Sequence, residues 1–241
     1  MEIEKELKLL VLCGGKGTRV ASISNGKPKS LLALGAKTLI DVVLENLVKQ
    51  LRISEIFMLT GFRSEHIENY YDKGHFEGVK LHFIKEQSPL GTGGAVLNAI
   101  QLIGPDEYLV INGDTMIDSD LNVFLKYSRK THSDITIAAF SVNDMEDYGG
   151  IKVDNSFNLI GFMEKRTSGA GLVNAGIYHI KDSHKLRHYL LSYLAREQQE
   201  LSMEKQILTE TTLSKKVWID LEGKFLDVGT PKRFKDAEGW I

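Results

Sequence analysis

Cysteine and proline are scarce in this sequence of 241 residues. The one cysteine, Cys13, excludes a disulfide framework within the chain and favours a reducing compartment. Only four prolines occur, and no Ser/Gly-rich or low-complexity block marks a linker. We therefore expect one domain that spans residues 1–241, with a sizeable core because 42% of the residues are hydrophobic.

Long runs of charge or of apolar residues are also missing. The net charge is −2 and Lys and Arg form no long basic run, which argues against a nucleic-acid partner. No apolar run reaches the length that a membrane span needs. Residues 1–8 alternate Glu and Lys and lack the apolar core of a signal peptide. We expect a soluble cytoplasmic protein that binds neither nucleic acid nor a membrane.

Strand and helix patterns alternate in the first half of the chain. Apolar runs predict strands at 8–13, 56–60, 79–85 and 108–112. Apolar residues at helical spacing predict helices at 38–51, 94–102 and 121–131. This alternation is typical of a parallel sheet with helices on both faces.

The second half of the chain predicts a mixed sheet. Strand patterns occur at 135–140, 150–153, 159–164, 173–179, 217–221 and 224–227, and helical patterns at 183–196 and 202–208. Asp154-Asn155-Ser156 indicates a hairpin between two of these strands. The expected fold is α/β, Rossmann-like, with three layers, a mixed but mainly parallel sheet, and a hairpin lid. In such sheets ligands bind beyond the carboxyl ends of the strands.

A glycine-rich loop, Gly14-Gly15-Lys16-Gly17-Thr18-Arg19, directly follows the first predicted strand. Glycine adopts positive φ without strain and lets another molecule approach the main chain closely. Successive N–H groups in such a loop bind anions, and a following helix adds its positive N-terminal end. Arg19 offers a permanently charged fork for phosphate oxygens. The pattern indicates a polyphosphate site, although many such turns only connect elements.

Two familiar phosphate motifs are not matched by this loop. The dinucleotide fingerprint needs a further glycine where Val20 stands, and no window fits G-x-x-x-x-G-K-[ST]. A dinucleotide-dependent oxidoreductase and a P-loop hydrolase are therefore disfavoured.

Two aspartates follow predicted strands in positions that suit a metal. Asp114 comes just after strand 108–112, and Asp227 ends strand 224–227. Each alone is more often a turn residue. Because both stand at strand ends downstream of the glycine loop, together they favour a Mg²⁺ site. Phosphate oxygens would complete the octahedral coordination of the metal. Lys29, stiffened by Pro28, could reach the same phosphates as Arg19, although a solvated loop lysine is the commoner case for such a residue alone.

A second glycine-rich loop at residues 86–95 again lies between a predicted strand and a predicted helix. Two such loops side by side indicate a nucleoside between them. The carboxylate of Glu86 matches the paired N1–H and N2–H₂ donors of guanine and suits uracil or thymine less well. A surface glutamate at a strand end is the alternative.

Charged residues at the end of strand 159–164 suit a sugar phosphate. Lys165 can meet its phosphate and Glu164 its hydroxyls, although exposed Glu-Lys pairs are usually only solvated charge. The seven histidines show no metal-ligand spacing, and no Ser-His-Asp arrangement is evident, so covalent catalysis is not indicated.

These motifs, in this order, resemble those of the sugar nucleotidyltransferases, also called nucleoside-diphosphate-sugar pyrophosphorylases. The resemblance runs from residue 8 to about residue 237 and rests on motifs at 14–19, 27–29, 89–94, 112–114, 164–165, 173–176 and 227–231. Within the family the chain is most similar to the D-glycero-D-manno-heptose 1-phosphate guanylyltransferases, through Pro-Leu-Gly-Thr-Gly-Gly at 89–94 and Leu-Ser-Met-Glu-Lys at 201–205.

The resemblance implies a nucleotidyltransferase fold of the GT-A-like class, with a nucleotide-binding half at about 1–115 and a sugar-phosphate-binding half at about 116–241. It implies nucleotide contacts for Leu12, Gly14, Gly15, Gly17, Thr18, Arg19, Glu86, Pro89, Gly91, Thr92, Asn112 and Gly113. It implies sugar-phosphate contacts for Gly149, Glu164, Lys165 and Asn174. Asp114 and Asp227 would hold Mg²⁺, and Arg19, Lys29 and Lys165 would be the catalytic cations.

The implied reaction is Mg²⁺-dependent transfer from GTP to a heptose 1-phosphate, giving GDP-heptose and pyrophosphate for surface polysaccharide precursors. The family also implies a homodimer. Asp147 and Ala175 depart from the residues common in the heptose enzymes near the expected sugar pocket. Mannose or glucose 1-phosphate with another nucleotide is therefore an alternative. A non-catalytic nucleotide-binding regulatory module is a second alternative, against which both aspartates and Lys165 argue.

Overall fold

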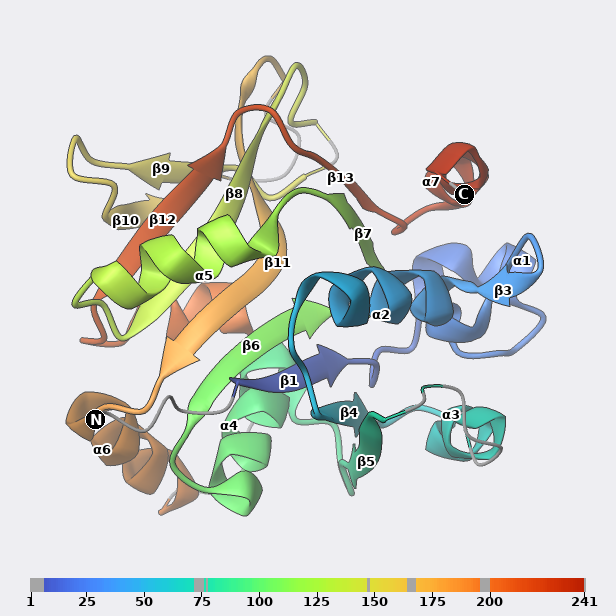
Figure 1. Cartoon of the computed structure of the whole chain (residues 1–241), viewed down its shortest axis with the longest axis horizontal. Coiled ribbons are helices and arrows are strands. Elements are labelled where there is room, and N and C mark those ends of the chain that lie inside the picture. The colour runs from blue at the N-terminus through green and yellow to red at the C-terminus, as the bar shows by residue number, and fades with distance from the viewer. Residues whose placement is uncertain are drawn as a thin grey trace.

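The computed structural model describes residues 7–71, 76, 78–146, 148–163, 168–195 and 200–240. Its centre is a seven-stranded sheet with the strand order β12-β8-β11-β6-β1-β4-β5 (Figure 1). These strands are β1 (Leu7–Leu12), β4 (Glu55–Thr60), β5 (Lys80–Lys85), β6 (Glu107–Asn112), β8 (Ile135–Val142), β11 (Gly171–Lys181) and β12 (Lys215–Asp220).

The sheet is mixed and mainly parallel, which confirms the predicted fold class. Strand β1 runs parallel to β4 and β6, β4 runs parallel to β5, and β12 runs parallel to β8. Strand β11 is antiparallel to both of its neighbours, β6 and β8. The parallel strands read as continuous apolar runs because both of their faces are covered: Leu9, Leu10 and Val11 are all fully buried.

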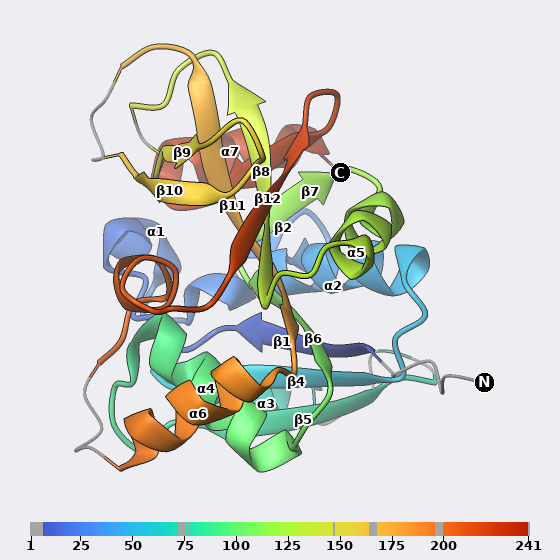
Figure 2. The ribbon, with the colours of Figure 1, turned by 90° about the vertical axis from the view of Figure 1, so that its left-hand side faces the viewer.

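Helices cover both faces of the sheet (Figure 2). On one face Leu44 of α2 (Leu39–Gln50) and Phe124 of α5 (Leu121–Lys130) join Leu9 and Val11 in one core, which α3 (Ser64–Tyr71) extends. On the other face α4 (Gly91–Ile103) and α6 (His184–Leu194) pack against Leu10 in a second core. Alternate residues of β1 thus belong to opposite cores, as the period of a strand requires.

Three small sheets and several short turns complete the described structure. The small sheets pair β7 (Thr115–Asp118) with β13 (Lys224–Asp227), β9 (Ile151–Val153) with β10 (Leu159–Phe162), and β2 (Ala33–Leu34) with β3 (Lys37–Thr38). The remaining helical pieces are η1 (Thr18–Val20), α1 (Ala21–Ser24), η2 (Lys29–Leu31), η3 (Met203–Ile207), α7 (Pro231–Ala237) and η4 (Glu238–Trp240). The β9–β10 pair confirms the hairpin that Asp154-Asn155-Ser156 predicts: Asp154 Oδ1 accepts hydrogen bonds from the main-chain N–H of Ser156 and Asn158.

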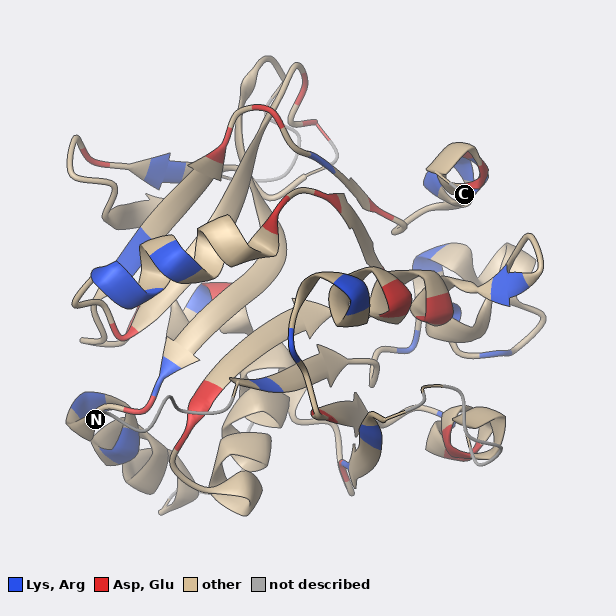
Figure 3. Cartoon of the chain, viewed as in Figure 1, with Lys and Arg blue, Asp and Glu red and all other residues tan. Residues whose placement is uncertain are grey.

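The structure differs from the sequence predictions in two places that matter for function. The glycine loop is followed only by η1 and the four-residue α1, which is too short for a strong helix dipole. The helical pattern predicted at 202–208 is confirmed, but the helix there, at residues 203–207, is a π-helix and not the common α-helix. Figure 3 shows Lys and Arg interspersed with Asp and Glu over the molecule, in keeping with the net charge of −2. Within the described ranges, no helix combines the length and apolarity needed to cross a membrane.

Candidate active site

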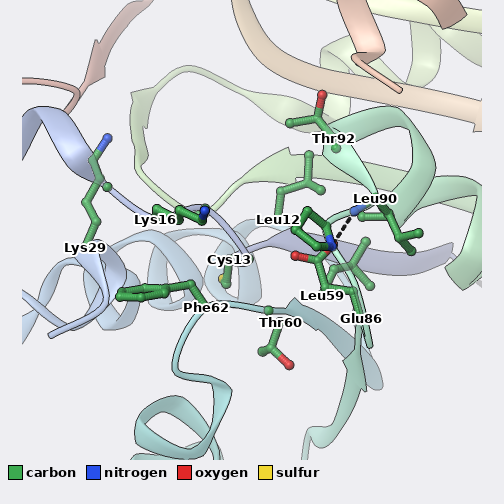
Figure 4. Close-up of a pocket in the computed structure, with 18 of the residues that line it drawn as sticks. Leu12, Cys13, Lys16, Lys29, Leu59, Thr60, Phe62, Glu86, Leu90 and Thr92 are labelled. Carbon is green, nitrogen blue, oxygen red and sulfur yellow. Dashed lines mark hydrogen bonds between the residues drawn. The ribbon is translucent and has the colours of Figure 1, made fainter. Parts of the chain in front are cut away.

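A cavity of about 600 Å³ lies at the carboxyl ends of β1, β4, β5 and β6 (Figure 4). This is the edge at which open α/β sheets bind ligands. The structure places every sequence-predicted nucleotide residue on its wall: Leu12, Gly14, Gly15, Gly17, Thr18, Arg19, Glu86, Pro89, Gly91, Thr92, Asn112 and Gly113. Lys29 and Asp114 line the same cavity. Figure 4 shows Lys29 at one side of it and Glu86 with Leu90 at the other.

The first glycine loop packs against the Lys29 segment. Gly17 has a φ of 58°, a conformation that favours glycine, and a Cβ there would lie 3.1 Å from the Cβ of Lys29. The main-chain N–H of Phe62 donates to the carbonyl of Gly14 at 3.2 Å, which ties the loop to the end of β4. Arg19 is exposed on the cavity wall. The loop therefore presents a bare main chain and one exposed guanidinium to the cavity.

Glu86 sits at the far end of the cavity in a slot that two glycines leave open. Its Oε2 accepts from the main-chain N–H of Leu90 at 3.0 Å. Its Oε1 lies only 3.1 Å from where a Cβ on Gly14 would stand and 2.1 Å from one on Gly61. Burial raises the pKa of Glu86, the Leu90 N–H opposes this rise, and the nearby Glu200 carboxylate adds to it. The carboxylate is thus partly desolvated and fixed in direction.

The second glycine loop receives another part of the chain. The N–H of Gly93, in the first turn of α4, donates to the carbonyl of Leu201 at 2.7 Å. Gly91 has a φ of 71°, and a Cβ there would lie 2.4 Å from the same carbonyl oxygen. The hydroxyl of Thr92 accepts from the main-chain N–H of Met203 at 2.8 Å. The glycines of this loop therefore admit residues 201–203 and still leave the loop on the cavity wall.

The two predicted metal ligands, 113 positions apart in the chain, meet through the β7–β13 pair. In this small sheet Asp227 lies opposite Thr115, and the N–H of Val228 donates to the carbonyl of Asp114 at 2.9 Å. The ammonium of Lys29 hydrogen-bonds Asp114 and lies 3.8 Å from Oδ1 of Asp227. The structure thus brings Lys29 and both aspartates together, as the sequence predicted.

Arg233 belongs to this cluster and was not predicted from the sequence. Its Nη1 donates to Oδ2 of Asp227 at 3.1 Å, and its guanidinium lies 4.0 Å from the ring centre of Tyr148. It stands at the third position of α7, whose N-cap is Thr230. Burial raises the pKa of Asp227 and repulsion from Asp114 adds to this, whereas Lys29, Arg233 and Arg19 oppose it. The sequence does contain a signal for this residue. Thr230-Pro231 is a typical start of a helix, and Arg233 follows three residues after the threonine.

The donor set of Asp114 and Asp227 fits a divalent cation. Both groups are hard carboxylates, and they already share one cation, the Lys29 ammonium. Mg²⁺ commonly takes one or two protein carboxylates and completes its shell with water and substrate phosphates. Over the described ranges no cluster of three or more His, Cys, Asp and Glu forms a fuller metal site.

Gly149 and Asn174, predicted on the sugar side, are in contact. The N–H of Asn174 donates to the carbonyl of Gly149 at 3.0 Å. Two residues further on, Gly176 has a φ of 69°, and a Cβ there would lie 2.1 Å from Nδ2 of Asn112, which lines the cavity. Gly176, two residues after Asn174, is therefore packed against a residue that lines the nucleotide cavity. The predicted Glu164 and Lys165, and Asp147, lie outside the described residues.

A Ser–His–Glu cluster between α5 and the strands β11 and β6 is structural. The Oγ of Ser128 lies 2.7 Å from Nδ1 of His179, whose Nε2 lies 3.5 Å from Oε2 of Glu107. Ser128 and His179 are fully buried, so no substrate can reach the hydroxyl. The pKa of Glu107 is lowered to about 2, because contact with His179 and then with Arg129 outweighs the opposing effect of burial.

Comparisons with known proteins agree with this geometry. A family model described as nucleotidyl transferase matches residues 8–239. A D-glycero-alpha-D-manno-heptose 1-phosphate guanylyltransferase from Campylobacter jejuni is 36% identical over 172 residues, 71% of this chain and 75% of the relative. One from Aneurinibacillus thermoaerophilus is 27% identical over 233 residues, 96% of this chain and 97% of the relative.

A solved structure is similar over almost the whole chain. The crystal structure of HddC from Yersinia pseudotuberculosis complexed with GMP-PN has a TM-score of 0.83 and 28% identity, and the alignment covers 97% of this chain and 98% of HddC. With the family match over nearly its whole length, and with the cavity and carboxylate pair at the expected edge of the sheet, this chain belongs to the nucleotidyl transferase family.

Proposed function

We propose that this protein transfers a guanylyl group from GTP to D-glycero-D-manno-heptose 1-phosphate, releasing pyrophosphate. One observation carries the proposal: a single cavity has a fixed carboxylate suited to guanine at one end and Asp114, Lys29 and Arg19 at the other. The names of the two relatives and the nucleotide analogue bound to HddC support the choice of GTP and heptose.

The nucleotide is oriented by residues at both ends of the cavity. The oxygens of Glu86 accept from N1–H and N2–H₂ of guanine, and the Leu90 N–H holds the carboxylate in that direction. The loop at residues 14–19 lays its bare main chain along the phosphates, with the Arg19 guanidinium beside them. In this orientation we expect the α-phosphate to lie near Asp114, which lines the same cavity.

The reaction is an in-line displacement at the α-phosphorus. An oxygen of the sugar phosphate forms a bond to this phosphorus while the bond to the bridging oxygen of the β-phosphate breaks, and pyrophosphate leaves with that electron pair. Because the attacking oxygen is already an anion, no general base is required. The main obstacle is repulsion between two polyanions, which positioning and charge neutralisation overcome.

Cationic groups around the α-phosphate supply that neutralisation. Arg19 and Lys29 act on the nucleotide side, and Lys165 on the sugar phosphate. Asp114 and Asp227 would hold Mg²⁺, which when bound supplies positive charge to the phosphate oxygens. Arg233 keeps the carboxylate of Asp227 in place. Gly149, Glu164 and Asn174 bind the hydroxyls of the sugar.

The experiment that tests the proposal is pyrophosphate release measured over a matrix of substrates. GTP, CTP, UTP, dTTP and ATP are each combined with heptose, mannose and glucose 1-phosphates in the presence of Mg²⁺. The expected result is fastest turnover with GTP and the heptose. Turnover with no pair contradicts an enzymatic function, and turnover with UTP but not GTP contradicts the role given to Glu86.

We also propose that the protein works in the cytoplasm as a homodimer. Light scattering coupled to size-exclusion chromatography tests the dimer, since a chain of 27.0 kDa should then elute with twice that mass.

A further inference from the structure

The stretch Leu201-Ser202-Met203-Glu204-Lys205 has no role in the reaction described so far. It enters the π-helix η3, and π-turns occur frequently at functional sites. Ser202 caps this turn: its hydroxyl accepts from the N–H of Lys205 at 3.2 Å. From residue 201 on, the described chain lies beside the N-terminal end of α4 (Figure 2).

Glu204 is joined to Asn174, on the sugar side, through one buried hydroxyl. The hydroxyl of Tyr178 accepts from Nδ2 of Asn174 at 2.8 Å and donates to Oε1 of Glu204 at 3.3 Å. Oε2 of Glu204 accepts from the hydroxyl of Ser202 at 2.9 Å. Tyr178 is fully buried, and burial together with the Glu204 carboxylate raises the pKa of its hydroxyl. Tyr178 therefore stays protonated and keeps both contacts.

These contacts fix the direction of the Asn174 amide. Its Oδ1 accepts from the N–H of Gly176 at 3.0 Å, and one of the two N–H groups at Nδ2 points to Tyr178. A reversed amide would present a donor to the Gly176 N–H, so the orientation is set. One N–H of Asn174 remains as a directed donor.

A bulge in β11 supports the same residue. Asn174 pairs with Ala139 of β8 and Tyr178 pairs with Ile137, so three residues of β11, 175–177, stand opposite one residue of β8. Gly176, with its φ of 69°, lies within this irregular stretch. Bulges of this kind redirect side chains next to active sites.

The same stretch also holds the nucleotide side of the cavity. The carbonyl of Leu201 accepts from the N–H of Gly93, and the N–H of Met203 donates to Thr92. Glu204 follows one residue later. One short turn thus contacts the second glycine loop at one end and, through Tyr178, Asn174 at the other.

We propose that Tyr178 and Glu204 are positioning residues for the acceptor, which hold the Asn174 amide so that its free N–H donates to a hydroxyl of the sugar 1-phosphate. This inference rests on the proposed function and deepens it, because it names residues that tune sugar affinity without touching the reacting atoms. The nucleotide site should not depend on the Tyr178 hydroxyl.

Isothermal titration calorimetry of the full chain tests this inference without requiring turnover. Heptose, mannose and glucose 1-phosphates are titrated into protein saturated with a non-hydrolysable GTP analogue, and the analogue is titrated separately. In Tyr178→Phe we expect about tenfold weaker binding of the sugar phosphate that the native protein binds best, because one directed hydrogen bond is lost. Binding of the GTP analogue should be unchanged.

The matched control is Tyr108→Phe. Tyr108 is a tyrosine of β6 that is as fully buried as Tyr178 but stands near the opposite end of that strand from Asn112. This variant should bind both ligands as the native protein does. Equal sugar affinity in Tyr178→Phe and Tyr108→Phe, or equal losses of sugar and nucleotide affinity in Tyr178→Phe, would overturn the inference.

A second pair of variants keeps the test decisive if Tyr178→Phe does not fold. Glu204→Gln retains an oxygen that accepts from Tyr178, whereas Glu204→Ala does not. We expect native-like sugar affinity in the first and weaker affinity in the second, and equal affinity in both contradicts the positioning role. If the native protein binds the GTP analogue but none of the sugar phosphates, the proposed function itself fails and the inference falls with it.

Discussion

Glu86→Gln is the substitution that probes base recognition most directly. The native carboxylate is held by the Leu90 N–H and seated between Gly14 and Gly61, so it has little freedom to turn away. Glutamine has the same shape and can still accept from Leu90 with its carbonyl oxygen. Its NH₂ group would then face the N–H donors of guanine. The change therefore leaves the local fold intact and replaces one acceptor with a donor.

The expected loss follows from the kind of hydrogen bond that is removed. A hydrogen bond to a charged group contributes about 1.5–3 kcal/mol. The cost of leaving an N–H donor of guanine opposite the amide N–H of the new glutamine falls in the same range. This corresponds to a decrease of roughly 10- to 150-fold in kcat/KM for GTP, since about 1.4 kcal/mol equals a factor of ten. Pyrimidine nucleotides present fewer donors to this position, so their kcat/KM should fall less.

The assay is pyrophosphate release at limiting nucleotide, with GTP and UTP compared in the same preparation. Glu200→Gln is the control because Glu200 lines the same cavity and is exposed, and its charge acts on Glu86 only through space. This control removes an equal charge and should leave the preference for GTP unchanged. An unaltered GTP to UTP ratio in Glu86→Gln would show that Glu86 only caps the Leu90 N–H, and would refute the reasoning.

The raised pKa of Glu86 also predicts that the kcat/KM for GTP depends on pH. Burial raises the pKa of Glu86, so this carboxyl takes up its proton at a higher pH than an ordinary glutamate does. The protonated form loses one acceptor for guanine. The kcat/KM for GTP should therefore decrease as the pH falls through the raised pKa of Glu86. In Glu86→Gln this decrease of kcat/KM at acidic pH should be absent. An identical acid limb in both proteins would argue against Glu86 as its origin.

Three further predictions concern the metal pair, the second glycine loop and the buried cluster. Asp227→Asn should lower Mg²⁺-dependent turnover by ~100-fold or more with an unchanged melting temperature, and near-native turnover would remove Asp227 from the metal site. Gly91→Ala should destabilise the protein by about 1–3 kcal/mol in urea unfolding because of its positive φ and the nearby Leu201 carbonyl, whereas Gly161→Ala, with open space around it, should not. Glu107→Gln should lower the unfolding free energy by about 1–2 kcal/mol at pH 6, after discounting for solvent screening. Because the folded-state pKa of about 2 lies below the ordinary 4.5, this loss should shrink as the pH falls from 4.5 towards 2, and a loss independent of pH would refute the assignment.

The strands of the nucleotide half were predictable because both of their faces are buried. Parallel strands covered by helices require continuous apolar runs, and β1, β4 and β6 show such runs in the sequence. The helix α2 was predictable for a related reason: Thr38 and Asp41 form a capping box at its start, and its apolar residues share one face. The residues that line the cavity were predictable because their motifs directly follow these strands in the sequence.

Other elements carry weaker local signals. Helix α3 has only two large residues, Ile67 and Tyr71, buried at helical spacing. Strand β7 is only four residues long and begins directly after the turn residues 113–114. The π-turn η3 depends on distant partners, since Thr92 receives the N–H of Met203. No local pattern specifies such a partner, so the sequence predicted a helical stretch there but not its π-helical form.

The surroundings of Asp227 show most clearly what could not be predicted from the sequence. The sequence predicted that Asp114 and Asp227 would meet, because both follow strands. It did not predict Arg233, whose guanidinium lies over the ring of Tyr148, a residue 85 positions earlier. The roles given to the site residues remain predictions, and those of Glu164 and Lys165 fall on positions outside the described residues.

The β7–β13 pair also bears on how the protein is made. All seven strands of the central sheet are complete once residue 220 has been synthesised, yet Asp227 and Arg233 come later. A nascent chain can therefore bury most of both cores while it still lacks half of the carboxylate pair. Acquisition of nucleotidyl transfer should therefore come after the central sheet has formed. Its appearance during cell-free translation would report that the final strand has docked.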